Sequence, residues 1–379
     1  MNKIPRIALM IILSSVLFAS GVFFGRTIAP VRYDDFLPLS DEQHGVIKQA
    51  IEYIEKESYF KKEFTPEKIY QGIISGVVNS LGDPYSYYMG KEDYRHLQDE
   101  SKGFYGGVGI QIGIRDGRKV VIAPFAGTPA DRAGVKAGDV ILKVNKTPAG
   151  PLTLEKVAGT IRGEPGTKVT IEFGRGEKTY EVELTREIIK IVSVEYKIIE
   201  NNLGYIKITL FNEPTANDVR KALDDLKKKG VRALILDLRK NPGGLLDSSV
   251  EVARFFLRGE IVSVIYSNGK TNTLKGYNPF VDLPLVVWVD GSTASAAEIL
   301  AGALQDHDAA YLIGRNSFGK GSVQRVWSLD DGGAVKLTIA KYRLPSGRIV
   351  DEKELVPDLI LPIDSTDKNY IEETLKYLK

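Results

Sequence analysis

Two side chains in the second half of the chain have the chemistry of a serine nucleophile and its base. The stretch "GSTASAAEI" (291–299) displays Ser295 among small residues, and "NSFGKGSVQ" (316–324) places Lys320 between two glycines. A neutral lysine amine can remove the proton of a serine hydroxyl and so activate it for attack on a carbonyl carbon. Lysine is almost fully charged at pH 7 in water, so this chemistry requires burial that lowers its pKa. Each stretch also has a plainer interpretation: a helix packed closely through small residues, and a lysine in a surface loop.

Histidine, the commoner base for a serine nucleophile, has no well-placed candidate. The chain has three histidines and no cysteine. His307 follows Ser295 on the same predicted helix, about 18 Å along its axis, and is out of reach if that helix is continuous. His44 and His96 lie in the N-terminal helical region. The lack of cysteine excludes disulfides, thiolate zinc sites and cysteine nucleophiles, and no metal or nucleotide motif occurs, so no cofactor or metal is expected.

The Ser295 hydroxyl is expected at the start of a helix. A buried strand, "PLVVWVD", precedes it, and the helix pattern "ILAGALQD" follows it. Free N–H groups at a helix N-terminus favour negative charge, so the N–H of Ala296 suits an oxyanion. A second donor is expected from "DLRKNPGGLL", where Gly243 and Gly244 lie at a strand-to-helix turn. Two such N–H groups would form an oxyanion hole.

Hydrophobic patterning divides the rest of the chain into three regions. Residues 31–101 have apolar side chains at helical spacing, 102–188 are rich in glycine and strand patterns, and 189–379 alternate short apolar strands with helix patterns. This alternation predicts an α/β core within a multidomain α/β (α+β) protein. The composition is ordinary for a globular protein, and the net charge of +2 gives no indication of a nucleic-acid partner.

The N-terminus begins with an uncharged run, "IALMIILSSVLFASGVFFG" (7–25), which has basic residues on both sides. As a helix it would be about 28 Å long, close to the thickness of a bilayer core. A signal peptide and an uncleaved transmembrane anchor both fit, and residues 1–30 are assigned to this segment. We favour the anchor because residues 22–24 continue the apolar run past the cleavage signal "ASG". The bulk of the chain is then expected on the extracytoplasmic side of the cell membrane, or secreted if the segment is removed.

The middle region resembles a PDZ domain. Three segments in order carry the resemblance: "GFYGGVGIQI" (103–112), "PFAGTPADRAGVKAGDVILKVN" (124–145) and "LTLEKVAGTIRGEPGTKVTIEF" (152–173). Each glycine-rich stretch alone would also fit a hairpin turn. Their combination predicts a peptide-binding module at 102–188.

The glycine-rich loop of this module is the expected binding site for a substrate C-terminus. Its N–H groups, at Gly107, Val108, Gly109 and Ile110, can turn toward one point and form a nest for a carboxylate. A strand that begins at Ile110 would offer an edge for an incoming peptide. Arg162, at the end of the predicted groove helix, is the candidate for coupling peptide binding to the active site.

Taken together, "STASAAEI", "FGKGSVQ", "DLRKNPGG" and the PDZ-like module resemble the carboxyl-terminal processing peptidases, or tail-specific proteases. The resemblance covers nearly the whole chain from about Asp41 onward. It implies a serine endopeptidase with Ser295 as nucleophile, Lys320 as general base and Gln324 orienting the lysine amine. It also implies the oxyanion donors named above and a core like that of the Clp protease and crotonase superfamily. That fold hosts several chemistries, so the function depends on the serine and the lysine.

Two other functions remain open at this stage. The first is a non-catalytic PDZ scaffold at the membrane, against which the set of Ser295, Lys320 and Gln324 argues. The second is a hydrolase or acyltransferase of the Ser-x-x-Lys type, because Ser317 precedes Lys320 by three positions. That motif works on a helix, which the glycines around Lys320 disfavour. The expected partners are protein or peptide substrates bound by their C-termini, and a homo-oligomer is left open.

The anchor predicts where the native protein is found. If residues 7–25 stay attached, the protein remains in the membrane fraction, while a chain beginning near Arg32 is soluble and folded because everything after it is globular in pattern. Membrane fractionation followed by N-terminal sequencing measures this. A mature N-terminus near Val22 would instead identify a cleaved signal peptide.

Overall fold

The computed structural model describes residues 39–350 and 353–378 of the chain. The predicted anchor at 7–25 lies outside these residues. In the described part of the chain, no helix combines the length and the apolar character needed to span a membrane. The chain divides into two compact units between Gly72 and Ile73, inside one helix.

The first unit is helical, as the spacing of apolar residues predicts. It contains α2 (Asp41–Glu57), the 3-10 turn η2 (Lys61–Glu63) and the first half of α3 (Pro66–Asn79). Ser40 caps α2 by accepting a hydrogen bond from the Gln43 N–H, and the Gln43 side chain accepts one from the Ser40 N–H in return. Several large apolar side chains of this unit are exposed: Val46, Ile47, Tyr53, Ile54, Tyr59, Phe60 and Tyr70.

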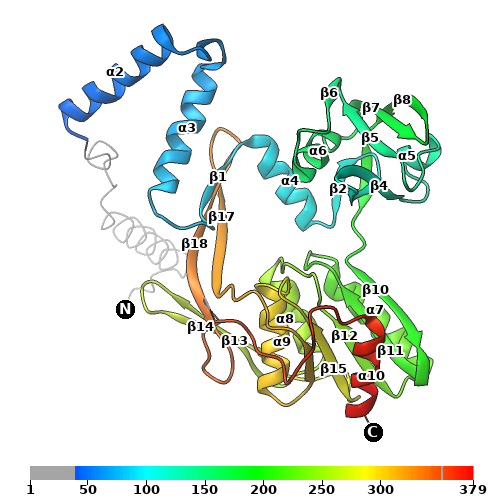
Figure 1. Cartoon of the computed structure of the whole chain (residues 1–379). Helices are drawn as coiled ribbons and strands as arrows, with labels where there is room; N and C mark the ends of the chain where they lie inside the picture. The colour runs from blue at the N-terminus through cyan, green and yellow to red at the C-terminus, as the bar shows by residue number, and fades with distance from the viewer. Residues whose placement is uncertain (1–38, 351–352, 379) are drawn as a thin grey trace, which may run out of the picture. The chain divides into compact units, whose positions relative to one another are not determined.

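The second unit contains the module predicted at 102–188, which is an antiparallel sheet with two short helices (Figure 1). Its strands are β3 (Ile110–Arg115), β4 (Arg118–Pro124), β5 (Val140–Val144), β6 (Thr147–Pro148), β7 (Lys168–Arg175) and β8 (Lys178–Thr185). They lie in the order β3-β4-β5-β7-β8, with β6 paired to β5. The helices are α5 (Pro129–Arg132) and α6 (Leu154–Ile161), and β2 (Phe104–Gly107) pairs with β9 (Glu187–Lys190). Phe173 is fully buried in the centre of this module, where truncation to alanine would cost about 3–5 kcal/mol.

A six-stranded sheet forms the core of the α/β region. Its strands are β10 (Val194–Ile199), β11 (Leu203–Ile208), β12 (Ala233–Asp237), β15 (Leu285–Val289), β16 (Tyr311–Gly314) and β19 (Leu359–Ile360), in that order. All neighbours from β11 to β19 pair in parallel, and β10 is antiparallel at one edge. Every residue of β12 and β15 is buried, because helices cover both faces of the sheet.

Helices from two parts of the chain cover these faces. The larger buried cluster packs one face against α7 (Thr215–Lys228), α8 (Leu246–Arg254) and α9 (Ala296–Asp306). The other face packs Ile235, Val286 and Trp288 against α10 (Asp367–Tyr377) at the C-terminal end. The α/β core predicted from the alternating pattern is therefore confirmed.

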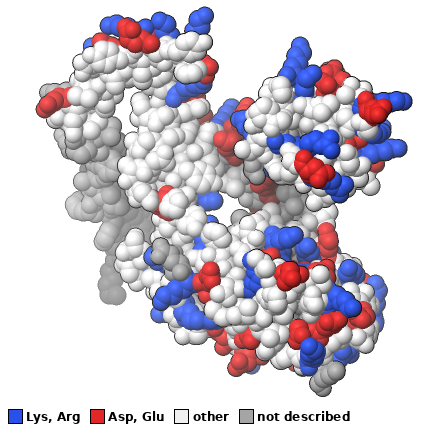
Figure 2. Space-filling model, viewed as in Figure 1, with Lys and Arg blue, Asp and Glu red and all other residues white. Residues whose placement is uncertain are grey.

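A second sheet brings distant segments of the chain beside the core. It contains β1 (Tyr87–Met89), β18 (Ala334–Arg343), β13 (Gly259–Tyr266) and β14 (Thr271–Gly276) in that order, with β17 (Ser322–Ser328) also paired to β18. Helix α4 (Lys91–Ser101) follows β1. The pairing of β1 with β18 places residues near 85 beside the strand that neighbours β17, which begins just after Lys320. Acidic and basic side chains are interspersed over the viewed face of this unit (Figure 2), in line with the net charge of +2.

Candidate active site

Ser295 lies at a sharp turn between β15 and α9, as the sequence pattern predicts. Its backbone has φ 54° and ψ −116°, and α9 begins at the next residue, Ala296. A non-glycine residue with positive φ is uncommon and persists only where its surroundings enforce it. The neighbours Ala294 and Ala296 are buried, whereas Ser295 is only half-buried. The turn therefore leaves the serine accessible while small residues fill the space behind it.

The buried carboxylate of Glu298 links the nucleophile turn to the lysine loop. Its Oε2 accepts hydrogen bonds from the backbone N–H groups of Ser295, at 2.7 Å, and Lys320, at 3.0 Å. Its Oε1 accepts the Ser317 hydroxyl at 2.5 Å and the Gly319 N–H at 2.7 Å. Burial raises the pKa of Glu298, while these hydrogen bonds oppose that rise. All four groups donate, so the arrangement matches an ionised carboxylate that accepts on both oxygens.

Glu298 was not predicted from the sequence, although a signal for it exists. Ser295 and Glu298 are three positions apart at a helix start, the S-x-x-E pattern of a capping box. In an ordinary capping box the glutamate bonds only the N-cap backbone N–H. Here it also holds the loop at 317–320, which sequence spacing alone does not indicate.

Lys320 lies at the end of this loop, just before β17. Its Nζ is 4.5 Å from the centroid of the Tyr85 ring. Burial lowers the pKa of the Lys320 amine, and nearby Lys336 lowers it further, while Asp83 and Glu298 oppose both effects. This lowering of the Lys320 pKa agrees with the requirement that a lysine base be partly neutral. In the described part of the chain no hydrogen bond joins the Lys320 amine to the Ser295 hydroxyl.

Gln324 lies on β17 and is bonded away from the lysine amine. Its Nε2 donates to the Ser322 hydroxyl at 2.8 Å and to the Thr338 hydroxyl at 3.1 Å. Its role in orienting Lys320 therefore stays a prediction.

The glycine turn after β12 packs directly against Ser295. A Cβ added to Gly243 would lie 2.7 Å from the Ala294 carbonyl oxygen and 3.0 Å from the Ser295 Cβ. Gly244 is equally confined, since a Cβ there would lie 2.1 Å from the Phe211 carbonyl oxygen. Both residues have positive φ, so only glycine fits without strain. The two loops that sequence analysis predicted to meet therefore do meet.

The N–H groups of this turn differ in availability. The Gly243 N–H donates to the Asn241 side-chain oxygen at 2.8 Å, and the Asn241 carbonyl accepts the Ala294 N–H at 3.0 Å. Within residues 39–350 and 353–378, the N–H groups of Gly244 and Ala296 have no acceptor. Of the three predicted oxyanion donors, these two are the ones free to bind a substrate oxygen in this structure.

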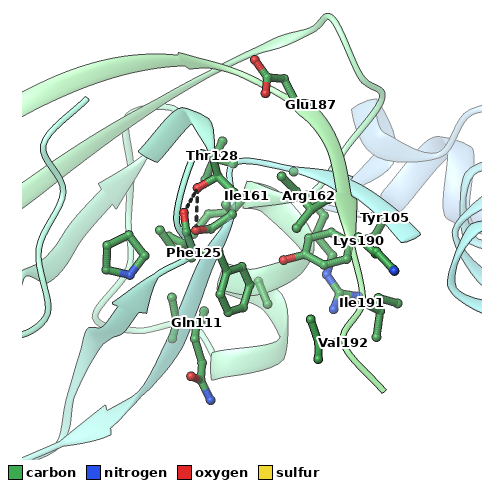
Figure 3. Close-up of a pocket in the computed structure, with 18 of the residues that line it drawn as sticks. Tyr105, Gln111, Phe125, Thr128, Ile161, Arg162, Glu187, Lys190, Ile191 and Val192 are labelled. Atoms are coloured by element: carbon green, nitrogen blue, oxygen red, sulfur yellow. Dashed lines mark hydrogen bonds between the residues drawn. The ribbon is translucent and has the colours of Figure 1, made fainter. Parts of the chain in front are cut away.

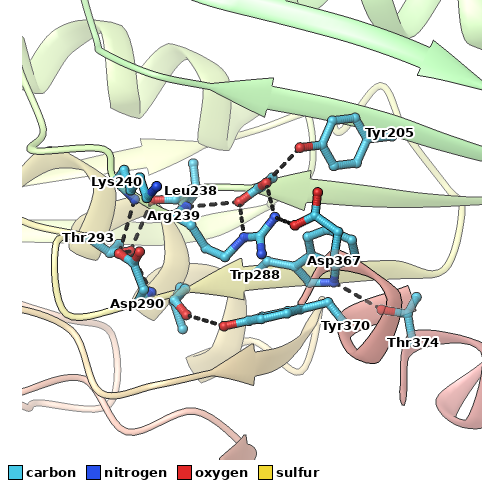
Figure 4. Close-up of polar contacts among 12 residues, drawn as sticks. Tyr205, Leu238, Arg239, Lys240, Trp288, Asp290, Thr293, Asp367, Tyr370 and Thr374 are labelled. Atoms are coloured by element: carbon cyan, nitrogen blue, oxygen red, sulfur yellow. Dashed lines mark hydrogen bonds and ion pairs between the residues drawn. The ribbon is translucent and has the colours of Figure 1, made fainter. Parts of the chain in front are cut away.

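An ion pair with a buried carboxylate lies at the start of the loop that leads to the glycine turn, and Figure 4 shows the Arg239 side chain of this pair among its neighbours. Asp237, at the end of β12, is fully buried and accepts hydrogen bonds from Tyr205 at 2.6 Å and from the Arg239 guanidinium. Arg239 stacks over Trp288 and Tyr370, with its Cζ 4.7 and 4.3 Å from their ring centroids. This pairing satisfies a carboxylate that would otherwise be strongly destabilising in the core. It holds the start of the loop that leads to Gly243.

The two alternative catalytic groups are placed where they cannot serve. His307 ends the continuous helix α9, as predicted, and its Nε2 is 2.6 Å from the Glu260 carbonyl oxygen. Ser317 is buried, donates to Glu298 and accepts the Leu355 N–H at 2.7 Å. Residues 316–321 are not helical, so the spacing between Ser317 and Lys320 does not put their side chains on one helix face. The Ser-x-x-Lys interpretation is therefore not supported.

Comparison with known proteins places this chain in a family. Residues 202–361 match the model "Peptidase family S41", 120–175 match "PDZ domain" and 37–93 match "Activating protease CtpB N-terminal domain". The carboxy-terminal processing protease CtpA of Bacillus subtilis is 36% identical over 87% of this chain and 73% of its own length. The chain belongs to the carboxy-terminal processing proteases of family S41. It is a serine protease.

Other relatives agree with this assignment. The carboxy-terminal-processing protease of Bartonella bacilliformis is 37% identical over 80% of this chain and 72% of its own length. Among solved structures, a photosystem II D1 C-terminal processing protease is similar, with a TM-score of 0.52 and 30% identity. That similarity covers 84% of this chain and 87% of the other. The PDZ and peptidase matches lie inside the predicted ranges 102–188 and 189–379.

A groove with a volume of about 1110 Å³ lies along the PDZ domain of this protease and extends to Thr209 and Leu210 of the core. Its lining includes the predicted residues Gly107, Val108, Gly109, Ile110 and Arg162. Figure 3 shows the side chains of Phe125, Ile161 and Arg162 around this space. The Thr128 hydroxyl beside them donates to the carbonyl oxygens of Gly109 and Phe125. The groove lies between β3 and α6, so an extended peptide can pair along β3.

Arg162 caps the C-terminal end of α6 and points to α4. Its guanidinium pairs with Glu100 at 2.5 Å and lies over the Tyr105 ring, 4.8 Å from the centroid. Glu100 also lines the groove. Arg162 thus joins the wall of the groove to a helix outside the PDZ sheet.

Glu298 is predicted to be essential to the protease site. Glu298→Gln replaces one accepting oxygen by a donating amide, so two donors lose a charge-assisted bond worth about 1.5–3 kcal/mol each. We expect kcat/KM to fall about 100-fold or more while circular dichroism still reports a folded chain. Glu251→Gln, at a carboxylate that is 52% exposed, is the matched control and should keep full activity. Wild-type kcat/KM in Glu298→Gln would show that the carboxylate does not organise the site.

Proposed function

We propose that this protease hydrolyses peptide bonds of exported proteins with a Ser295–Lys320 dyad, after its PDZ domain captures their C-terminal tails. The observation that carries the dyad is the Glu298 carboxylate, whose Oε2 accepts the backbone N–H groups of both residues. A single buried charge thereby sets the positions of nucleophile and base together. The free N–H groups of Gly244 and Ala296 beside Ser295 support the oxyanion role.

In this mechanism the neutral Lys320 amine removes the Ser295 proton as Oγ attacks the scissile carbonyl carbon. The oxyanion that forms is stabilised by the N–H groups of Gly244 and Ala296 and by the N-terminus of α9. The lysine ammonium then donates its proton to the departing amine, leaving an acyl-enzyme. The Lys320 amine, neutral again, then deprotonates a water molecule. This water attacks the ester of the acyl-enzyme and releases the new C-terminus.

The dyad needs one rearrangement before it can act. The Lys320 amine makes no hydrogen bond to Ser295 among the described residues, so one side chain must turn toward the other. We propose that peptide binding in the PDZ groove favours that turn. The side-chain oxygen of Gln324 would then accept a hydrogen bond from an N–H of the lysine amine and orient it.

Two contacts support a route from the groove to the site. Thr209 and Leu210 line the groove, and the next residue, Phe211, donates to the Gly243 carbonyl at 2.8 Å and accepts the Leu245 N–H at 2.7 Å. A peptide that displaces residues 209–210 would therefore act on the proposed oxyanion turn. Arg162, through Glu100, is the proposed second link. The connection at 186–192 also lines the groove from Glu187 onward.

Recognition of C-terminal tails is supported by the relatives and by the groove. The Bacillus and Bartonella proteins are named for carboxy-terminal processing, and the similar solved structure is that of a photosystem II D1 C-terminal processing protease. The glycine-rich loop and the apolar lining of this PDZ groove suit a terminal carboxylate followed by apolar side chains. A scaffold without catalysis is not favoured, since the relatives are proteases.

Location and assembly remain proposals. We propose a cell-membrane protein with its protease on the extracytoplasmic side, which rests on the apolar run at 7–25. A homo-oligomer is proposed because α2 and its neighbours expose large apolar side chains that an assembly would cover.

The dyad predicts distinct outcomes for two substitutions. Ser295→Ala should abolish proteolysis of a tagged protein without unfolding the chain, because alanine fits among the small residues there. Lys320→Arg should be nearly inactive, since a guanidinium stays charged at any working pH. Wild-type activity should rise with pH through the lowered pKa of Lys320, because only the neutral amine is a base.

The controls for the dyad are exposed residues of the same types nearby. Ser292→Ala and Lys353→Arg change exposed side chains and should keep full activity. Full activity of Lys320→Arg would rule out lysine as the base, and activity of Ser295→Ala would rule out Ser295 as the nucleophile.

Tail recognition predicts a difference between a free acid and an amide. One substrate peptide with a C-terminal carboxylate should bind at least about ten-fold more tightly than its amide, because each charge-assisted bond contributes about 1.5–3 kcal/mol. Calorimetry and cleavage rates of both peptides measure this. Equal binding and cleavage of the two peptides would show that the endopeptidase does not select its substrates by their terminal carboxylate.

A further inference from the structure

The aromatic face beside Lys320 comes from a part of the chain far from the proposed dyad. Tyr85 precedes β1, and its half-buried ring lies 4.5 Å from the Lys320 Nζ. A ring face attracts an ammonium ion but not a neutral amine. The contact therefore favours the protonated state of Lys320, the residue proposed as the base.

The backbone around Tyr85 is held in place by hydrogen bonds and strand pairing. Asp83 accepts the Tyr85 N–H at 3.1 Å and the Ser86 hydroxyl at 2.5 Å. The Ser86 hydroxyl in turn accepts the Thr338 N–H of β18 at 3.0 Å. From Tyr87 onward the chain pairs with β18. These contacts fix the backbone at Tyr85 to β18. The same strand pairs with β17, which begins just after Lys320.

Burial and three kinds of neighbouring group act on the charge of the Lys320 amine in this arrangement. Lys336 on β18 repels its charge, and Asp83 and Glu298 attract it. Burial disfavours the charge most strongly. The Tyr85 ring adds an attraction at van der Waals range, which solvent and salt screen less than a distant charge.

We infer that Tyr85 is a positioning residue for the proposed base, whose ring holds the protonated Lys320 ammonium in a resting place without a hydrogen bond to Ser295. Loss of the proton to water removes the attraction. The neutral amine is then free to turn to Ser295 and take the hydroxyl proton as Oγ attacks. The inference rests on the proposed role of Lys320 as the base. It identifies the Tyr85 ring as a group that opposes the deprotonation of Lys320 at low pH.

The test is the titration of Lys320 in Tyr85→Leu and Tyr85→Phe. Leucine keeps an apolar neighbour but removes the ring face, so the pKa of Lys320 should fall by about 0.5 to 1.5 pH units. Phenylalanine keeps the face and should leave the pKa unchanged. The amine is followed by NMR in the Ser295→Ala background, where proteolysis is absent, and its signal is assigned by its loss in Lys320→Ala.

Kinetics of the same substitutions in active protease provide an independent readout. In Tyr85→Leu the acid limb of the kcat/KM profile should move to lower pH, so activity below the wild-type midpoint should rise several-fold. Tyr277→Leu is the matched control, because Tyr277 is an exposed tyrosine that is not among the groups acting on the Lys320 amine. It should leave the titration of Lys320 in place.

The outcomes separate this inference from the proposed function. An unchanged Lys320 pKa in Tyr85→Leu, or an equal fall in Tyr277→Leu, overturns the role of the Tyr85 ring. A fall in the pKa without movement of the acid limb supports the ring contact and overturns Lys320 as the base. Parallel shifts in both, with Tyr85→Phe like wild type, support the inference and the base together.

Discussion

The arrangement proposed as the active site is organised around one buried negative charge. Glu298 is fully buried, and its carboxylate accepts four hydrogen bonds from two segments: one from the turn at Ser295 and three from the loop at 317–320. Without those donors the charge would be expelled from the core or neutralised. With them, the carboxylate makes the positions of nucleophile and lysine mutually dependent. The two sheets and the loops that follow their strands bring these donors to the Glu298 carboxylate.

The parallel sheet supplies a stiff frame for this arrangement. β12 and β15 are buried along their whole length, and each ends in a loop that contributes to the site. Asp290, just after β15, accepts the Lys240 N–H at 3.0 Å, so the two loops are tied before they reach Gly243 and Ser295. Loops at the carboxyl ends of adjacent parallel strands meet at one edge of a sheet. The nucleophile turn and the glycine turn are therefore neighbours by topology.

Much of this site could be predicted from local sequence, because turns and helix starts depend on neighbouring residues. Ser295 before a helix and the glycines at 243–244 after a strand are patterns of that kind. Glu298 and Tyr85 were missed since their partners lie on other elements, and one-dimensional spacing does not report such contacts. The engagement of the Gly243 N–H by Asn241 likewise depends on side-chain geometry. The role of Lys320 as base was inferred from its place between two glycines and from the lack of a well-placed histidine, whereas the role of Gln324 came from family resemblance. Both stay predictions.

The backbone of Ser295 has a consequence for how this enzyme can change. Threonine is the nearest chemical substitute for serine as a hydroxyl nucleophile, yet its branched Cβ makes a φ near 54° a genuine outlier. A one-step exchange of nucleophile would keep the hydroxyl but strain the turn that presents it. Divergence at this position is thus limited to small side chains without that branch, and among residues that fit the turn only serine carries a hydroxyl. A descendant in which a small unbranched residue replaces this serine would keep the turn and lose the hydroxyl in a single step.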